Sequence, residues 1–492
     1  MENGSNAKAL HSLGITGNGI NVGLISVRNV RSTHSAFNDS NGVHVFNYDF
    51  SGSGVGYTGL SPAGHDTWVA GIIASRGWTG HTSDVGVSPG CNIYSARVLD
   101  DTCDVNITYL DNALNTFITA YNCKVFVLPI QFTGKANGSS SYSKMIDYYA
   151  YANDVVFALA SGNDLSYPTI FGDAYNGITA GALIDEPNDY YFKVGSKSNP
   201  GPTIDYRKKP EICCPGSRQI TPSIDSDTSY YTTIKDGATS FAVPHTGGVA
   251  ALLLQYANQT SDADDGHNVV IKAAIVNSAF PNIKDKDGAA TYPADPNNVW
   301  HKQRGYGKID ALRAYQTLSA GRVSKSSTIT STAGWAYYIM DANQTHNYLI
   351  AGQEGERLVL TVTWNRLITK TGSTYNVDSP IFKINLTVKN PSGSTIYHHA
   401  GDANNLERIE LILPADGNYT VSLSNATSKS RPYGLAFELL EPLSGDFNLD
   451  YIVDDLDLQQ IAYEWLSSGV NCLDFADFAK NWMKTDKRYY NP

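Results

Sequence analysis

Residues 237–245 read GATSFAVPH, and this stretch decides the fold when it is taken with two earlier ones. Residues 64–71 read GHDTWVAG, and residues 160–163 read ASGN. A serine hydroxyl is a poor nucleophile at neutral pH unless a base lies beside it, and histidine is the most frequent base. Ser240 opens a predicted helix over residues 240–258, where backbone N–H groups and the helix dipole favour a developing negative charge.

Together the three segments resemble the subtilisin-like serine proteases, in the chain order of that family. The resemblance covers about residues 12–320 and includes residues 86–90, GVSPG, just before a strand-like run. It implies that Ser240 is the nucleophile and that His65 is the general base and acid. It also implies that the side-chain amide of Asn163 donates to the oxyanion, a contact whose loss typically lowers the rate by ~10²–10³.

One member of the family's catalytic set is missing. Residues 22–28 read VGLISVR and place Ser26 where the family has an aspartate. That aspartate orients the histidine and stabilises its protonated form, and a neutral replacement lowers the rate by ~10⁴. Ser26 can accept a hydrogen bond from His65 but cannot offset its positive charge. Asp66 and Asp49 are alternative carboxylates, although Asp66 is expected to point elsewhere because it is the immediate neighbour of His65 in sequence.

The predicted substrate cleft also departs from the family. Where the family has Ser-Leu-Gly-Gly, residues 129–132 read PIQF. Gln131 and Phe132 carry side chains where glycines let a substrate backbone approach, and Pro129 removes an N–H group. Two independent departures favour a peptidase homologue that is catalytically impaired or inactive and that acts outside the cell as a binding or structural component.

Two other functions stay open at this point. The first is an active secreted serine endopeptidase with an atypical triad, anchored through its C-terminal module. The second, weaker alternative is a hydrolase of another ester or amide. An active peptidase is expected to react with a fluorophosphonate at Ser240. An assembly protein is expected not to react and to form oligomers or filaments.

The chain divides into three predicted domains. Residues 1–322 alternate strand-like and helical stretches, which is typical of an α/β subtilisin-like domain with a parallel sheet flanked by helices. Residues 323–441 carry short alternating runs between turn signals, which predicts an all-β, jelly-roll-like sandwich. Residues 442–492 predict a small α-helical module.

The clearest runs give element boundaries. Predicted strands of the first domain span residues 20–25, 93–99, 125–130, 155–160 and 177–181. Its other predicted helices span residues 67–74, 107–120, 143–152 and 269–277. Predicted strands of the sandwich span residues 358–364, 382–388 and 416–423.

The C-terminal module carries a calcium-loop pattern. Side-chain oxygens fall at loop positions 1, 3, 5, 9 and 12, which is the spacing that Ca²⁺ requires. The corresponding residues are Asp446, Asn448, Asp450, Asp454 and Asp457. With predicted helices at 458–466 and 478–483, the module resembles a dockerin, which implies a cohesin-like protein partner or self-assembly.

Two departures weaken the calcium prediction. Tyr451 occupies the turn position usually held by glycine, and the second half of the module lacks its first three ligands. We therefore expect one weak Ca²⁺ site at most. The alternative is an acidic, solvated loop between two helices.

Composition excludes several classes of protein. The net charge of −11 argues against a nucleic-acid partner, and no apolar run is long enough to span a membrane. The N-terminus lacks the regions of a signal peptide, so the chain is either cytosolic or a mature portion of a longer chain. Sequons favour a secreted or cell-surface glycoprotein, and the candidate acceptors are Asn38, Asn106, Asn137, Asn258, Asn343, Asn385, Asn418 and Asn425. Of the six cysteines, Cys103 and Cys123 are candidates for a disulfide, which sequence cannot establish.

Overall fold

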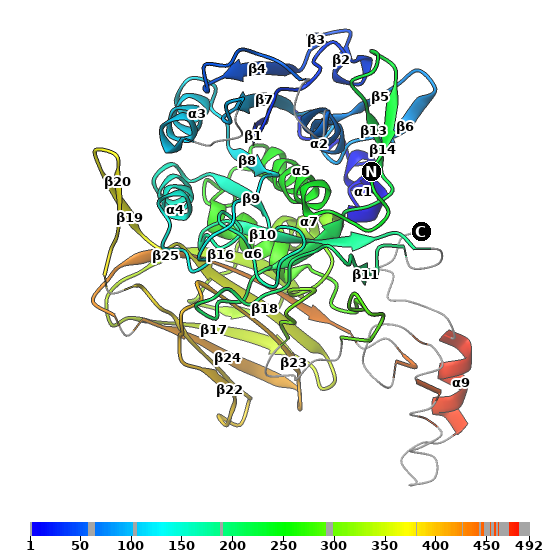
Figure 1. Cartoon of the computed structure of the whole chain (residues 1–492). Coiled ribbons are helices and arrows are strands. Elements are labelled where there is room, and N and C mark those ends of the chain that lie inside the picture. Colours follow the sequence, from blue (N-terminus) through cyan, green and yellow to red (C-terminus); the bar gives the residue numbers. More distant parts are fainter. Residues whose placement is uncertain are drawn as a thin grey trace.

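A computed structural model gives the architecture of the chain, with an α/β domain resting on a β-sandwich (Figure 1). The described residues are 2–57, 64–101, 106–186, 190–291, 299–379, 381–425, 427–441, 444–446, 453, 457–458, 461 and 472–481.

The α/β domain is built on an eight-stranded sheet. Its strands are β1 (Asn21–Ser26), β4 (Val45–Asp49), β7 (Asn92–Arg97), β8 (Val125–Leu128), β9 (Val156–Ala160), β10 (Ile178–Ile184), β11 (Lys193–Val194) and β12 (Ile212–Pro215). The order is β11-β10-β9-β8-β1-β7-β4, with β12 also paired to β10. Every pairing is parallel except that of β10 with β11. The predicted parallel sheet is therefore present.

Helices cover both faces of this sheet. They are α2 (His65–Ala74), α3 (Ile107–Thr119), α4 (Ser141–Asn153), α5 (Thr239–Ala257), α6 (Asn268–Asn277) and α7 (Ala311–Ser319). Val125 and Val127 of β8 join the core that contains α5, whereas Phe126 and Leu128 join the core that contains α3 and α4. Because both faces are buried, β8 is a continuous apolar run without polar alternation.

Shorter elements complete the domain. They are η1 (Glu2–Ser5), α1 (Lys8–His11), η2 (Ser35–Phe37), β2 (Asn38–Asp39), β3 (Gly42–Val43), β5 (Arg76–Trp78), β6 (His81–Val85), β13 (Ile220–Pro222) and β14 (Tyr230–Thr232). The hairpin of β13 and β14 stands beside α2, and its first strand contacts that helix.

The predicted sandwich consists of two antiparallel sheets and a separate hairpin. Its strands are β15 (Thr328–Ile329), β16 (Ala333–Met340), β17 (Thr345–Gly352), β18 (Arg357–Trp364), β19 (Ile368–Thr371), β20 (Thr374–Val377), β21 (Asn385–Lys389), β22 (Thr395–His399), β23 (Leu406–Ile412), β24 (Gly417–Ser424) and β25 (Arg431–Leu440). One sheet has the order β15-β17-β24-β21-β22, with a short parallel pairing at β15, and the other has the order β16-β25-β18-β23. Buried residues from both sheets fill the space between them.

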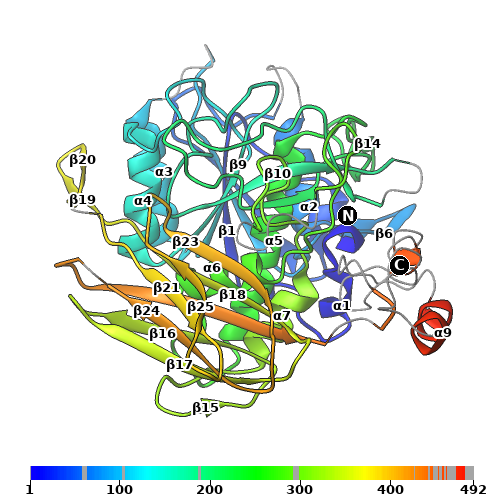
Figure 2. The ribbon, with the colours of Figure 1, turned by 90° about the horizontal axis from the view of Figure 1, so that it is seen from below.

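Helix α6 joins the two domains. All ten of its residues are buried, and strands β18 and β25 of the sandwich lie across it, as the view in Figure 2 shows from below. The hydroxyl of Thr363 donates to the carbonyl of Val269 over 2.7 Å. Gly434 on β25 has no space for a side chain, since a Cβ there would lie 2.4 Å from the same carbonyl oxygen. The sandwich is therefore packed directly on the α/β domain.

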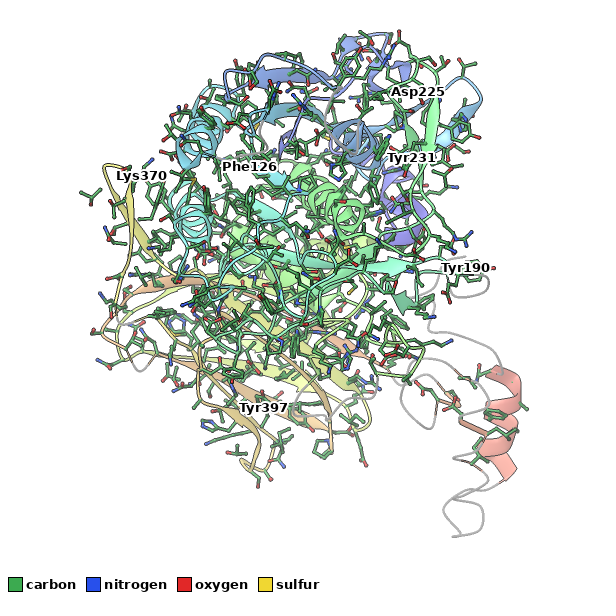
Figure 3. The ribbon with its side chains drawn as sticks, in the orientation of Figure 1. Phe126, Tyr190, Asp225, Tyr231, Lys370 and Tyr397 are labelled. Carbon is green, nitrogen blue, oxygen red and sulfur yellow. The ribbon has the colours of Figure 1, made fainter. Side chains whose placement is uncertain are left out.

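The hairpin of β19 and β20 reaches back from the sandwich to α4. Lys370 on β19, labelled in Figure 3, places its ammonium 2.7 Å from a carboxylate oxygen of Asp111 on α3. The hydroxyl of Tyr375 donates to the same carboxylate over 2.7 Å. Burial of Asp111 alone would raise its pKa, but these donors outweigh burial and lower it.

Several predicted boundaries shift for identifiable reasons. Strand β8 ends at Leu128, two residues before the predicted end, because Pro129 has no N–H for the ladder. The strand predicted from residue 382 begins at Asn385, since the carbonyl of Phe382 accepts a hydrogen bond from the indole of Trp364. Helices α2 and α5 begin at His65 and Thr239, slightly earlier than predicted.

In the C-terminal module, helix α9 spans Cys472–Asn481. The helix predicted for residues 478–483 therefore begins six residues too late. Phe478 packs with Val453 and Ile461 in a small apolar cluster. No helix within the described residues is both long enough and apolar enough to cross a membrane.

Candidate active site

A cavity of about 500 Å³ opens beside the carboxyl ends of β1 and β8 and the first turns of α2 and α5. The carboxyl ends of parallel strands are the usual place for ligands in open α/β sheets. Its lining comprises Val27, Arg28, Gly64, His65, Asp66, Trp68, Leu99, Pro129, Ile130, Gln131, Phe132, Asn163, Tyr231, Ile234, Ala238, Ser240 and Phe241. Ser240, His65 and Asn163, which come from three distant segments, are thus brought together in one cavity.

Ser240 lies in the first turn of α5 and is 8% exposed. The first N–H groups of a helix have no intrahelical partner, and the dipole makes this end favourable for negative charge. His245, at the end of the same motif, is instead a core residue whose Nε2 lies 3.1 Å from the side-chain oxygen of Gln219. Burial holds the pKa of His245 well below its ordinary value, so this ring is neutral and structural.

His65 is the first residue of α2 and follows Gly64, whose φ of 88° lies in the left-handed region. A Cβ at Gly64 would lie 3.2 Å from both Ile224 and Trp68, so the approach to the helix is tight as well as left-handed. The His65 ring lies against Phe241, with 5.8 Å between ring centroids. This turn presents the imidazole to the cavity directly beside the start of α5.

The side chain of Asp66 turns toward the end of β1 and is buried, with 2% exposure. One of its oxygens, Oδ1, accepts a hydrogen bond from the hydroxyl of Ser26 and lies 3.5 Å from Nδ1 of His65. The other oxygen, Oδ2, accepts a hydrogen bond from the backbone N–H of Arg28 over 2.8 Å. A carboxylate is therefore present beside the imidazole, although Ser26 replaces the aspartate that the family has on β1.

One expectation from the sequence is corrected here. Asp66 was expected to point away from His65, yet its carboxylate faces Nδ1 of that ring. The sequence also allowed Ser26 to accept a hydrogen bond from His65, and the structure gives its hydroxyl another partner, since it donates to Asp66. Helical geometry separates adjacent side chains, but His65 is the first helical residue and two donors from the β1 segment hold Asp66 in place.

Asp49, the other alternative carboxylate, has different partners. It accepts hydrogen bonds from the hydroxyl of Ser51 over 2.6 Å and from the N–H of Gly54 over 2.8 Å. Burial alone would raise the pKa of Asp49, but these hydrogen bonds outweigh burial and lower it. Asp49 does not line the cavity, so it is not brought to the site.

Asn163 has its amide orientation fixed by Thr239. The backbone N–H of Thr239 must donate, and it lies 3.0 Å from the Asn163 side-chain oxygen. The Thr239 hydroxyl lies 3.2 Å from the same oxygen. With its oxygen held in this way, the amide leaves its NH₂ group free of this contact at the cavity wall.

The three predicted cleft residues line the same cavity. The side-chain oxygen of Gln131 accepts a hydrogen bond over 2.7 Å from the backbone N–H of Asn163, another residue that lines the cavity. Phe132 packs against Phe171, with 5.3 Å between ring centroids. Its carbonyl accepts a hydrogen bond from the N–H of Ile170 over 3.0 Å. Hydrogen bonds therefore connect the segments that line this end of the cavity, and Ser240 still lines the cavity.

An aromatic wall beside His65 was not recognised in the sequence. Trp68 and Tyr231 stack with 3.8 Å between ring centroids, and Phe241 lies against Trp68. Figure 3 labels Tyr231 on β14, next to α2. Trp68 lies about one helical turn after His65, and Phe241 directly follows Ser240. This proximity in sequence to the predicted catalytic residues could have indicated that both rings line the site. Tyr231 arrives from a hairpin whose docking could not be read from its own residues.

The predicted calcium ligands are only partly described. Asn448, Asp450 and Asp454 lie outside the described residues, whereas Asp446 and Asp457 are buried. Within the described ranges, no group of three or more His, Cys, Asp or Glu side chains could hold a metal ion. The calcium site therefore stays a prediction.

The candidate glycosylation sites differ in accessibility. Asn106, Asn258, Asn343 and Asn418 are exposed, and Asn38, Asn137 and Asn385 are half-buried. Asn425 is buried, and its amide donates to the carbonyls of Asp341 and Lys429 over 2.9 and 2.7 Å. A glycan on Asn425 would require this turn to open.

Four of the described cysteines are buried free thiols: Cys91, Cys123, Cys213 and Cys214. Burial raises the pKa of Cys91 to about 11 and that of Cys214 to about 12, which makes both unreactive at neutral pH. Cys103, the suggested disulfide partner of Cys123, lies outside the described residues. The suggested bridge is not present, since Cys123 is a free thiol.

Comparison with known proteins adds a family to this geometry. The model of the subtilase family matches residues 11–308. Thermitase from Thermoactinomyces vulgaris is 30% identical over 254 residues, which cover 51% of this chain and 75% of thermitase. Subtilisin amylosacchariticus from Bacillus subtilis subsp. amylosacchariticus is 27% identical over 249 residues, covering 50% of this chain and 58% of the relative.

Other similarities are more limited. The chain spans 58% of the length of the first curated relatives that it matches. Among solved structures, the prenylagaramide maturation protease PagA is 22% identical, with a TM-score of 0.48 and coverage of 63% of this chain and 98% of PagA.

Proposed function

Because the chain belongs to the subtilase family, we propose that it is a serine peptidase that works through Ser240, His65 and Asn163. In this proposal the Ser240 hydroxyl oxygen attacks the carbonyl carbon of a peptide bond while its proton passes to His65. The carbonyl oxygen becomes an oxyanion, which accepts a hydrogen bond from the Asn163 amide. His65 then returns the proton to the leaving amine, and water releases the acyl group by the reverse sequence.

A single observation carries this proposal: the three residues come from distant segments and line one cavity. The fixed amide of Asn163 supports its role, because a preorganised donor needs no rearrangement as the oxyanion forms. The start of α5 adds N–H groups and a favourable dipole at Ser240. Such electrostatic stabilisation is usually the largest part of catalysis in acyl transfer.

Labelling and turnover together test the proposal. The purified chain is treated with a fluorophosphonate probe and with a broad peptide library, beside a Ser240→Ala variant. We expect labelling and peptide hydrolysis in the parent and neither in the variant. Hydrolysis that persists in Ser240→Ala would contradict the role of Ser240, and an unlabelled, inactive parent would contradict peptidase activity.

A second candidate function is the non-catalytic one, in which the chain serves as an extracellular binding or assembly component. It is favoured by the hydrogen bond between Gln131 and Asn163 within the cavity and by the uncharged Ser26 on β1. This function predicts that the parent chain forms oligomers or filaments and hydrolyses no peptide. Sedimentation of the parent and of Ser240→Ala distinguishes it, because self-assembly should not depend on the nucleophile.

We further propose that residues 442–492 form a dockerin-like module that binds Ca²⁺ and a cohesin-like protein, and that the chain acts outside the cell. Support comes from the donor spacing and from the burial of Asp446 and Asp457. Calorimetric titration of the full chain with CaCl₂ should show one weak site that Asp446→Ala removes. Peptide hydrolysis should be the same with and without EDTA, because these residues are not among those that line the catalytic cavity.

A further inference from the structure

We propose that Asp66, the residue next to His65 in sequence, supplies the negative charge that orients the imidazole and stabilises its protonated form. This inference rests on the proposed peptidase function, because it assigns the partner of the proposed base. In this arrangement the carboxylate that the family places on β1 is carried by α2, and Ser26 on β1 holds it in position. Asp66 is thus a positioning residue that acts through His65.

The contacts of the carboxylate define which nitrogen of His65 it faces. Oδ1 of Asp66 lies 3.5 Å from Nδ1 of His65, so Nε2 is left for the nucleophile. This separation is longer than an ordinary hydrogen bond. Catalytic hydrogen bonds are often long in the absence of substrate and shorten in the complex. The contact therefore matches that of a base awaiting substrate.

Two donors from the end of β1 keep the carboxylate in this position. The Ser26 hydroxyl binds Oδ1, and the Arg28 backbone N–H binds Oδ2 over 2.8 Å. Both Ser26 and Asp66 are buried, which limits other orientations of the carboxylate. Ser26 therefore does not replace the missing aspartate directly; it anchors its substitute.

The negative charge of Asp66 is directed to His65 and not to another cation. Arg28 contributes only its backbone N–H, because its guanidinium pairs with Asp101 over 3.0 Å. Throughout the described part of the chain, His65 is the one basic side chain within ion-pair distance of Asp66. Protonation of His65 during attack would therefore place the positive charge beside a buried carboxylate.

The proton balance of the reaction is simple. As Ser240 Oγ bonds to the carbonyl carbon, its proton moves to Nε2 of His65, and the C=O electron pair moves to oxygen. His65 is then a cation, while Asp66 keeps its negative charge and Nδ1 keeps its proton. When the C–N bond breaks, the Nε2 proton passes to the leaving nitrogen, and the oxyanion re-forms the carbonyl.

An Asp66→Asn variant tests the inference because it keeps the shape and removes the charge. We expect kcat to fall by ~10³–10⁴, as for other triads with a neutral third member, with a much smaller change in KM. The matched control is Asp84→Asn, which removes a carboxylate that lies 2.7 Å from Nδ1 of another histidine, His81, outside the residues that line the cavity. It should change kcat by less than about threefold, since this pair does not contact the catalytic residues.

A carboxylate transfer keeps the test decisive if Asp66→Asn folds poorly. The double variant Ser26→Asp with Asp66→Gly returns the carboxylate to β1. We expect the kcat of the double variant to be at least tenfold higher than that of Asp66→Gly alone. Either an unchanged kcat in a folded Asp66→Asn variant or no recovery in a folded double variant would overturn the inference.

A proton NMR measurement separates this inference from the peptidase proposal. In the parent and in Ser240→Ala, the Nδ1 proton of His65 should give a far-downfield resonance that Asp66→Asn removes. If the parent hydrolyses no peptide, the peptidase proposal fails, and this resonance still decides the role of Asp66. Its persistence in Asp66→Asn would overturn the pairing of Asp66 with His65.

Discussion

The side chain of Gln131 accepts a hydrogen bond from the backbone of Asn163, with 2.7 Å between Oε1 and the nitrogen. The two residues follow the neighbouring strands β8 and β9, so the bond joins two segments that line the cavity. A peptide that enters this end of the cavity must displace Gln131 or pass beside it. Gln131 is exposed, so its removal should not disturb the core.

We predict that Gln131→Ala lowers KM for peptides with large side chains by about threefold to tenfold. Each 1.4 kcal/mol of improved binding is a factor of ten, and one displaced side chain accounts for no more than that. Gln131→Met is the matched control, because it keeps the size and loses the acceptor. If Ala and Met variants improve KM equally, the hydrogen bond and not the bulk is the obstacle. Unchanged KM in both would contradict a barrier at Gln131.

A second prediction concerns the proposed oxyanion donor. Asn163→Ala should lower kcat by ~10²–10³ with little effect on KM, because the donor acts on a charge that appears in the transition state. Thr239→Val removes one of the two donors that fix the amide but keeps the backbone N–H. Thr239→Val should therefore lower kcat by less than about tenfold. Steady-state measurement of kcat and KM on one peptide tests both variants. If Asn163→Ala weakens substrate binding as much as it lowers kcat, Asn163 does not act specifically on the transition state.

A third prediction concerns the junction between the domains. Arg366, which follows β18, donates from Nε and Nη2 to one carboxylate oxygen, Oδ2, of Asp147 on α4, and both side chains are nearly completely buried. Arg366→Ala leaves a buried carboxylate without its cation, so we expect the free energy of unfolding to fall by about 3–5 kcal/mol. Lys370→Ala breaks a half-exposed pair with Asp111 and should cost less than about 1 kcal/mol.

Denaturant unfolding followed by tryptophan fluorescence measures both changes. Because α6 lies between the α/β domain and the sandwich, we expect one cooperative transition in the parent. Two separated transitions, with Arg366→Ala affecting only one of them, would contradict this view of the junction.

The sequence predicts much of the α/β domain because its signals are local. The apolar run of β8 and the start of α5 within the Ser240 motif follow directly from residue patterns. The family resemblance was also carried by short motifs, and the match over residues 11–308 confirms it. Shifts at strand ends came from single groups such as the missing N–H of Pro129, whose effect local patterns locate only to within a few residues.

The pairing of Asp66 with His65 could not be predicted in the same way. The direction of a side chain at the first turn of a helix depends on what surrounds it, here Ser26 and Arg28 from 38 to 40 residues earlier. Likewise, the stacking of Tyr231 on Trp68 depends on how a distant hairpin docks. Long-range contacts of this kind leave no periodic signal in either segment.

The last prediction concerns pH and stability. Asp310 caps α7 by accepting a hydrogen bond from the N–H of Arg313 over 3.0 Å, and it also binds the side chain of Asn6. Burial raises the pKa of Asp310 from its ordinary value of 3.8 to about 6. Between these two pH values the folded chain holds a proton that the unfolded chain has released. Its favourable contribution is therefore complete below about pH 4 and is lost as the pH rises through 6.

Asp310→Asn keeps the acceptor for the cap and removes the ionisation. The difference between 3.8 and about 6 corresponds to about 3 kcal/mol, so the variant should be more stable than the parent by up to that amount above pH 7. The two should converge near pH 4. Asp287→Asn, at an exposed carboxylate, is the control and should show no such pH dependence. Parallel unfolding curves for parent and Asp310→Asn from pH 4 to 8 would show instead that Asp310 is ionised throughout in the folded chain.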